Sequence, residues 1–135
     1  MSDAPDLRTR PHALRRLHLA VSARPRLLIS LASAGQIAES GPTPYFILID
    51  RALRDEGTSY HYLPAAPFAA AAPDLLALAD GALAGCGEPV YRGASWTTDA
   101  PFRETESAVA SRRGDGILAV EMEAAALYAF AQARA

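Results

Sequence analysis

The stretch GILAVEMEAAA, residues 116–126, decides the fold of this 135-residue chain. Its first five residues form a short apolar run of the kind found in buried strands. The run leads directly into a helical pattern that we expect to extend from Glu123 to Arg134. A strand that passes straight into a helix is typical of an α/β fold, in which helices cover a sheet.

The same alternation continues toward the N-terminus. Apolar runs predict buried strands at residues 27–31 and 45–49, and a further strand is expected at 88–94. Helical spacing and capping residues predict helices at residues 12–23, 73–84 and 105–112. The polar stretches 50–64 and 95–104 are expected to be loops. The sequence therefore predicts an α/β fold with a mixed sheet flanked by helices, preceded by a disordered tail at residues 1–11 and formed by one partial domain at 12–135.

Composition excludes several functional classes. Half of the residues are hydrophobic and 21% are charged, so the chain can bury a core. All thirteen basic residues are arginines, which excludes Schiff-base chemistry and a phosphate-binding P-loop lysine. Three scattered histidines and one cysteine predict no metal site. The lone Cys86 cannot form an internal disulfide, so we expect a cytoplasmic protein, and no apolar run approaches the length that spans a membrane.

The N-terminal arginines raise the question of nucleic-acid binding. Residues 1–26 hold six arginines but only two acidic residues, Asp3 and Asp6. No interleaved aromatic residues or known binding module accompany them. We favour a solvated helix face and a loose tail over a phosphate-binding surface, and expect no nucleic-acid partner.

Two carboxylates stand around a methionine where the last strand becomes a helix. Glu121 and Glu123 are two residues apart, so they point in different directions, and one can face a ligand while the other anchors the turn. A carboxylate offers two acceptor oxygens, which suits the paired hydroxyls of a ribose. Taken alone, the pair is better explained as negative charge at the N-terminus of an amphipathic helix.

Three stretches resemble one family in order and spacing. The motif EMEAAA at residues 121–126 resembles the ribose-binding motif of the nucleoside phosphorylase family, which includes purine nucleoside phosphorylases, uridine phosphorylases and methylthioadenosine nucleosidases. The stretch WTTDAPFRET at 96–105 is similar to the base-side loop of the family, and RALRDEGTSYHY at 51–62 is similar to the loop after its central strand. The resemblance covers about residues 14–135 and implies a truncated nucleoside phosphorylase-like domain.

The resemblance implies a substrate site made of six residues. Glu123, beside Glu121, would bind the ribose 2′- and 3′-hydroxyls, and Met122 would pack against the sugar. Phe102 would form an apolar wall for the base, Arg103 would read a polar edge of the base or pair with neighbouring acids, and Thr98 would contact the substrate. The resemblance assigns no catalytic residue.

Other residues near these motifs have plainer expected roles. Asp99 is expected to organise its loop, and Trp96 to lie in the core. Residues 60–62, Tyr-His-Tyr, are expected to line the pocket or a subunit interface.

The resemblance weakens where the family holds phosphate. An arginine of the family is replaced by Ser30, and Ser33 keeps a hydroxyl that we expect to contact phosphate weakly. Arg26 or Arg54 would have to take over the role of the missing guanidinium. The N-terminal phosphate loop of the family has no counterpart, and its base-protonating acid would lie beyond Ala135.

The sequence therefore leads to two functional hypotheses. The first is a nucleoside phosphorylase-like protein that binds a purine or pyrimidine nucleoside and cleaves its N-glycosidic bond by phosphorolysis or hydrolysis. Inorganic phosphate is then the possible co-substrate, and no other cofactor is expected. The second is a catalytically inactive family member that acts as a binding or structural subunit. A homo-oligomer is expected in both cases, since the family places its active sites at subunit boundaries.

Overall fold

The structure is a computed structural model that describes residues 27–134. Its contacts divide the chain into two units, residues 1–32 and 33–135, and each is described by itself. The described part of the first unit, residues 27–32, forms no helix or strand. The second unit contains all the strands and helices of the described residues. The expected tail at 1–11 and helix at 12–23 lie outside the described residues.

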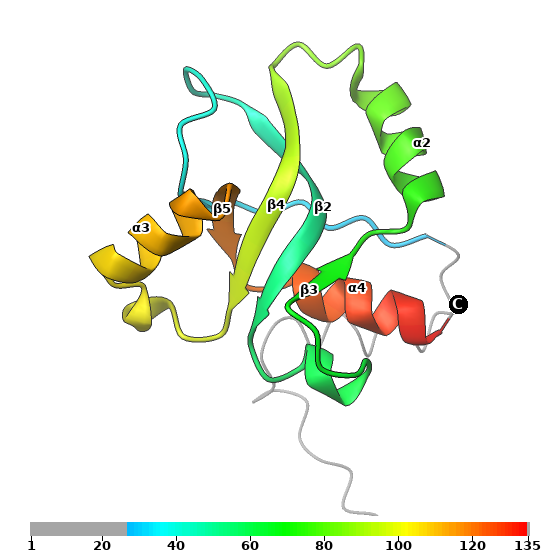
Figure 1. The fold of residues 1–135 in the computed structure, drawn as a ribbon. Coiled ribbons are helices and arrows are strands. Elements are labelled where there is room, and N and C mark those ends of the chain that lie inside the picture. Colours follow the sequence, from blue (N-terminus) through cyan, green and yellow to red (C-terminus); the bar gives the residue numbers. More distant parts are fainter. Residues whose placement is uncertain (1–26, 135) are drawn as a thin grey trace, which may run out of the picture. The chain divides into compact units, whose positions relative to one another are not determined.

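A five-stranded mixed sheet forms the centre of the second unit (Figure 1). Three strands, β2, β4 and β5, run parallel, and the short edge strands β1 and β3 run antiparallel to their neighbours. The strand order is β1-β5-β4-β2-β3. The strands are β1 (Gly35–Gln36), β2 (Phe46–Asp55), β3 (Phe68–Ala70), β4 (Val90–Thr98) and β5 (Ile117–Glu121). The predicted α/β fold with a mixed sheet is confirmed.

Within residues 27–134, two helices and two single-turn 3₁₀ segments connect the strands, and a third helix follows the last strand. Their positions confirm the expected helices at 73–84, 105–112 and 123–134. Pro73 opens the first of them, where its missing N–H costs nothing, and the Thr105 hydroxyl caps the second by accepting from Ala108 N at 3.3 Å. The elements are η2 (Ser59–His61), α2 (Pro73–Leu83), η3 (Pro101–Arg103), α3 (Glu106–Gly114) and α4 (Ala124–Ala133).

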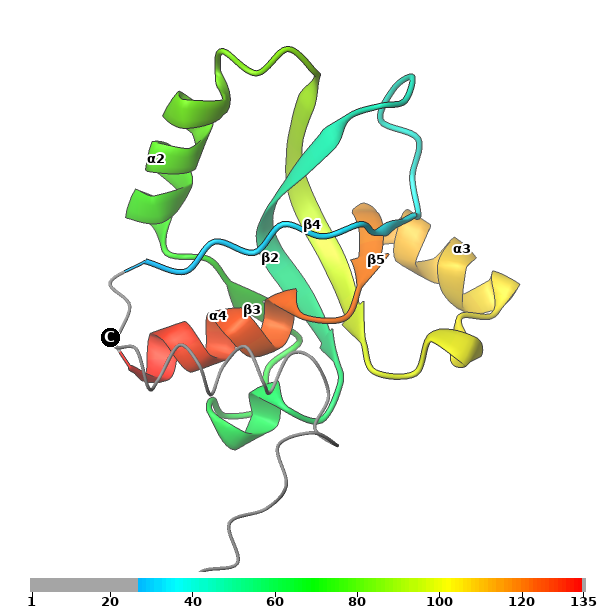
Figure 2. The same cartoon turned by 180° about the vertical axis from the view of Figure 1, so that it is seen from behind.

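Alternation along β4 separates the two faces of the sheet. Ala94 and Trp96 lie in a buried cluster against which Ala108 and Val109 of α3 pack. Ser95 and Thr97 point to the other face, where α4 covers the sheet. Figures 1 and 2 show α3 beside β5 and α4 across the lower part of the opposite side. Trp96 is buried, as its expected core role requires.

The predicted buried strand at 27–31 is wrong. Residues 27–34 have no regular structure, and the strand that pairs with β5 is the two-residue β1. An apolar run supplies β propensity, but a strand also needs a partner for its backbone hydrogen bonds. Here Gly35 pairs with Val120 instead, and a Cβ at Gly35 would come within 2.8 Å of the Val120 side chain.

The predicted loops at 50–64 and 95–104 begin too early. Strand β2 continues to Asp55, six residues beyond its expected end, and β4 continues to Thr98, four residues beyond its expected end. Arg54 near the end of β2 and Thr97 and Thr98 at the end of β4 are polar yet buried, because each has hydrogen-bond partners inside the protein. The short strand β3 was not expected, because its sequence, FAA, carries a weak strand signal.

Candidate functional site at the carboxyl edge of the sheet

The three parallel strands end side by side at one edge of the sheet. Asp55 of β2 pairs with Thr98 of β4, and Thr97 pairs with Glu121 of β5. This edge, at the lower end of the sheet in Figure 1, is followed by three loops at residues 56–67, 99–105 and 122–123. In open α/β sheets, ligands bind in the crevice outside the carboxyl ends of the strands. The six expected substrate residues all belong to this edge. Glu121 is the last residue of β5, and the other five lie at the end of β4 or in the loops that follow the strands, at residues 98, 102, 103, 122 and 123.

Glu121 is fully occupied inside the protein. Its Oε1 accepts from Ser95 Oγ at 2.9 Å and from Thr97 Oγ1 at 2.5 Å. Its Oε2 accepts from the backbone N–H groups of Glu123 at 2.8 Å and Ala124 at 2.6 Å. These two N–H groups open α4 and have no partner within the helix. Glu121 is therefore the anchoring carboxylate, which answers the question that the spacing of the two acids left open.

Glu123 differs from Glu121, because its side chain makes no bond to the described residues. It is the N-cap residue of α4, and its side chain makes no capping bond. Within residues 27–134 its half-buried carboxylate has no hydrogen bond or ion pair. The neighbouring Met122 is 46% exposed, so an apolar surface lies next to an unused carboxylate. The pair offers two acceptor oxygens and a soft apolar surface, the combination that a sugar diol requires.

The loop after β4 supplies the remaining expected contacts. Phe102 in η3 is fully exposed, and the Arg103 side chain has no partner among the described residues. Thr98 is buried at the end of the strand, where its hydroxyl accepts from Ala100 N at 3.2 Å. Asp99 accepts from Gly57 N at 3.1 Å and so ties this loop to the loop after β2. The structure thus brings these residues to the same edge, but gives Thr98 a turn-forming role there.

The loop after β2 is built around a buried arginine. Arg54 donates from Nε to Ser59 Oγ at 2.8 Å and from its two terminal nitrogens to the carbonyls of Pro64 at 2.7 Å and Leu63 at 3.2 Å. Its guanidinium also lies 4.1 Å from the centre of the Tyr60 ring. Arg54 is therefore committed to its own loop and is not available to replace a phosphate-binding arginine. Arg26, the other candidate, lies outside the described residues.

The loop after β2 is closed by a second buried charge. Glu56 accepts from Thr58 N at 2.6 Å and from Ser59 N at 3.0 Å, which shapes the turn into η2. Tyr62 packs edge-on against Phe130 of α4, with ring centroids 5.5 Å apart. His61 is exposed, and its expected role at a pocket or interface stays a prediction.

Ser33 lies two residues before β1, next to the same edge. Gly35 pairs with Val120 in antiparallel register, and the same register continued by two residues brings residue 33 to the level of Met122. Ser33 is exposed, so its hydroxyl is accessible to a ligand. The weak phosphate contact expected of Ser33 stays a prediction.

Negative charge dominates the edge. The last two residues of the three parallel strands and the loops that follow them hold six carboxylates and two guanidinium groups, those of Asp55, Glu56, Asp99, Glu104, Glu121 and Glu123 and of Arg54 and Arg103. An excess of negative charge repels an anion and attracts a cation. The edge therefore favours positive charge on a bound molecule.

Tyr128 fixes α4 to the sheet next to this edge. Its hydroxyl donates to the carbonyl of Ile49 at 2.6 Å. Burial, and then the negative charges of Glu121 and Asp50, raise the pKa of Tyr128 to about 12. The hydroxyl therefore keeps its proton at neutral pH and remains a donor.

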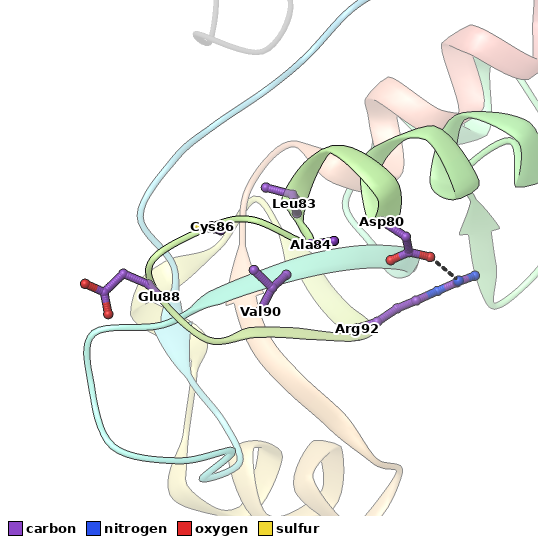
Figure 3. A pocket seen from close by; sticks show the side chains of 7 residues that line it. All are labelled: Asp80, Leu83, Ala84, Cys86, Glu88, Val90 and Arg92. Carbon is purple, nitrogen blue, oxygen red and sulfur yellow. Dashed lines mark hydrogen bonds and ion pairs between the residues drawn. The ribbon is translucent and has the colours of Figure 1, made fainter.

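A shallow pocket of about 290 Å³ lies elsewhere, at the other end of β4 (Figure 3). Its lining includes Val90 and Arg92, and the Arg92 guanidinium pairs with Asp80 of α2 at 2.9 Å. Val90 is about 26 Å along the strand from Thr98, at about 3.3 Å per residue. This pocket is therefore separate from the carboxyl edge.

In the described part of the chain, no group of acidic, histidine or cysteine residues could hold a metal ion, and no helix could cross a membrane.

Two residues of the site were missed from the sequence. Ser95 and Thr97 are completely buried and hold Glu121 in place. Both fall in a stretch that was expected to be a loop. The sequence did contain a sign of them, because Ala94 and Trp96 alternate with Ser95 and Thr97. This two-residue period is typical of a strand with one apolar face and one polar face.

Known structures share this architecture. An AMP nucleosidase from Bacteroides thetaiotaomicron superposes with a TM-score of 0.77 at 24% identity, covering 90% of this chain and 51% of its own. A uridine phosphorylase from Vibrio fischeri gives 0.68 at 28% identity, covering 76% and 42%. A Helicobacter pylori MTAN mutant with 5′-methylthioadenosine in its active site gives 0.72 at 17% identity, covering 89% and 55%. The chain thus spans about half the length of these structures.

Sequence comparison agrees with the structural one. A search of curated proteins gives no significant match. The profile of the Phosphorylase superfamily, however, matches residues 10–135, which include the whole sheet and the three loops at its carboxyl edge. On this match and the shared fold, the chain belongs to the phosphorylase superfamily.

Proposed function

We propose that this chain binds a purine or pyrimidine nucleoside at the carboxyl edge of its sheet and cleaves the N-glycosidic bond. Glu123 binds the ribose 2′- and 3′-hydroxyls, Met122 packs on the sugar, and Phe102 stacks on the base. Arg103 reads a polar edge of the base. This role belongs to nucleoside metabolism and nucleotide salvage, for which we propose a cytoplasmic location.

One observation carries this proposal. Of the two carboxylates that flank Met122, Glu121 has both oxygens occupied, whereas Glu123 has neither occupied within the described residues. Because the anchored Glu121 fixes the backbone of Glu123, the unused carboxylate of Glu123 is a preorganised acceptor. A diol donates two hydrogen bonds to such a group.

The charge of the edge favours hydrolysis over phosphorolysis. Cleavage of a glycosidic bond passes through an oxocarbenium-like sugar, which carries positive charge. The six carboxylates of the edge stabilise that charge, whereas they repel phosphate. We therefore propose water as the main nucleophile.

Glu123→Ala is expected to weaken nucleoside binding several-fold to a hundredfold, or by about 1–3 kcal/mol, the value of a charge-assisted pair of hydrogen bonds. Calorimetric titration with uridine, inosine and methylthioadenosine measures the change. Glu88→Ala, which removes an exposed acid at the other end of β4, is the matched control and should bind as the unmutated chain does. Equal losses in the two variants would show that general negative charge, rather than a contact from Glu123, matters.

An activity assay separates an enzyme from a binding subunit. The chain is incubated with the three nucleosides, with and without phosphate, and the products are separated by chromatography. Release of the free base together with its sugar, which is ribose from uridine and inosine and methylthioribose from methylthioadenosine, supports the proposal. Binding without release of base identifies the chain as an inactive family member with a binding role.

We expect the chain to form a homo-oligomer, either a dimer or an assembly of dimers. The sheet ends in two short edge strands, and the large apolar side chains of Phe46, Leu75 and Leu78 are exposed on the second unit. Exposed apolar surface and open strand edges are commonly covered by a partner. Light scattering at micromolar concentration measures the mass, and a well-behaved monomer would contradict the expectation.

A further inference from the structure

We propose that Thr97 is a positioning residue that sets the place of Glu123 and thereby the preference for a ribose diol. This inference rests on the proposed function. Thr97 makes no expected contact with the nucleoside, and it acts through the junction of β5 and α4.

The Thr97 hydroxyl makes two bonds from a fully buried position. Its relative exposure is 0%. It donates to Glu121 Oε1 at 2.5 Å and accepts from Ala125 N at 3.0 Å. A hydroxyl has one proton, so the donation to Glu121 leaves its oxygen free to accept from the amide. Both bonds are therefore satisfied by one orientation of the group.

Thr97 and Glu121 together hold the first turn of α4. Glu121 Oε2 accepts from the amides of Glu123 and Ala124, and Thr97 accepts from the next amide, that of Ala125. Three successive N–H groups, which have no partner within the helix, are thus held by side chains from two strands. The backbone of Glu123 is fixed at the start of this row. A change at Thr97 therefore reaches the Glu123 carboxylate through hydrogen bonds.

Water cannot take the place of the Thr97 hydroxyl. Ala125 is also completely buried, so its N–H would stay without a partner if the hydroxyl were removed. The first turn of α4 would then shift or open to find another acceptor. Thr97 also precedes Thr98 and Asp99, which shape the loop that carries Phe102. One residue thus links the sugar side of the site to the base side.

Thr97→Val tests this link, because valine keeps the shape and loses the hydroxyl. We measure the affinity for uridine and for 2′,3′-dideoxyuridine by calorimetry. The ratio of the two affinities reports the diol contact alone. We expect the ratio to fall most of the way to one in Thr97→Val, because small displacements of a positioned group carry large penalties. Thr97→Ser keeps the hydroxyl and should restore the ratio.

Ser95→Ala is the matched control. It removes the other hydroxyl that donates to Glu121 Oε1 but leaves all three amides of α4 held. It should keep most of the preference. If Thr97→Val does not fold, Thr97→Cys, a weaker donor of similar size, replaces it with the same expected direction.

Amide hydrogen exchange of residues 123–125 gives a second readout that needs no ligand. Exchange at these amides should rise in Thr97→Val and stay normal in Thr97→Ser. Equal loss of uridine and dideoxyuridine binding, or unchanged exchange, would overturn the role of Thr97 while the proposed function stands. An unmutated chain that binds both ligands equally would instead overturn the proposed function itself, and the positioning role with it.

Discussion

Glu121→Ala is expected to lower the free energy of unfolding by about 3–5 kcal/mol, although Glu121 lies in the motif that resembles a ligand site. Its carboxylate accepts from two side-chain hydroxyls and two backbone amides. Hydrogen bonds to a charged group contribute about 1.5–3 kcal/mol each, and their effects are not additive. Alanine would leave the two buried hydroxyls and the first amides of α4 without their acceptor.

Urea unfolding measures this effect, and Glu123→Ala is the natural control. The two glutamates are two residues apart, yet the Glu123 side chain makes no bond within the described residues. Its removal should change stability by no more than about 0.5 kcal/mol. If Glu121→Ala leaves too little folded protein, Glu121→Gln serves as a milder variant, because it keeps one acceptor oxygen. Equal stability of the two alanine variants would contradict the assignment of Glu121 as the anchor.

The affinity for inorganic phosphate is expected to be roughly 30- to 1000-fold lower than at a family site that has its arginine. The loss of an arginine–phosphate contact in a partly buried site amounts to about 2–4 kcal/mol. Ser30 stands where the resemblance implies that arginine. Arg54 is hydrogen-bonded within the loop after β2 and so cannot bind phosphate. The six carboxylates at the edge also repel phosphate, which is an anion. Any cleavage of nucleosides should therefore be nearly independent of phosphate.

Calorimetric titration with phosphate, together with analysis of the sugar product, tests this expectation. Arg103→Ala is a second variant to test. Of the two arginines at the edge, Arg103 is the one whose side chain has no partner among the described residues. The variant should leave the weak phosphate affinity unchanged. Tight phosphate binding, or ribose 1-phosphate as the main product, would show that another arginine holds the anion.

The junction of β5 and α4 could be predicted from the sequence almost residue by residue. A five-residue apolar run followed directly by a helical pattern leaves few alternatives, and the strand and helix begin within one residue of the expected positions. The expected strand at 27–31 failed because local propensity cannot supply a partner strand. The ends of β2 and β4 were misjudged because Arg54, Ser95 and Thr97 are polar. Arg54 is bonded within the loop that follows β2, whereas Ser95 and Thr97 are bonded to Glu121 of a later strand.

The candidate site was predictable in outline only. The spacing of Glu121 and Glu123 showed that they point in different directions, but the roles of the two acids depend on β4. Ser95 and Thr97 reach Glu121 from 26 and 24 residues away in sequence. No local pattern contains that contact. The same is true of Arg54, whose partners lie across a turn.

Calorimetric titration of the unmutated chain with uridine and with 2′,3′-dideoxyuridine tests the ribose-diol contact most directly. The two ligands share the base and the 5′-hydroxyl and differ in the diol that Glu123 is proposed to bind. We expect uridine to bind several-fold to a hundredfold more tightly, and the difference to disappear in Glu123→Ala. Equal affinity of the unmutated chain for both ligands would contradict the proposal that this edge of the sheet holds a nucleoside by its ribose.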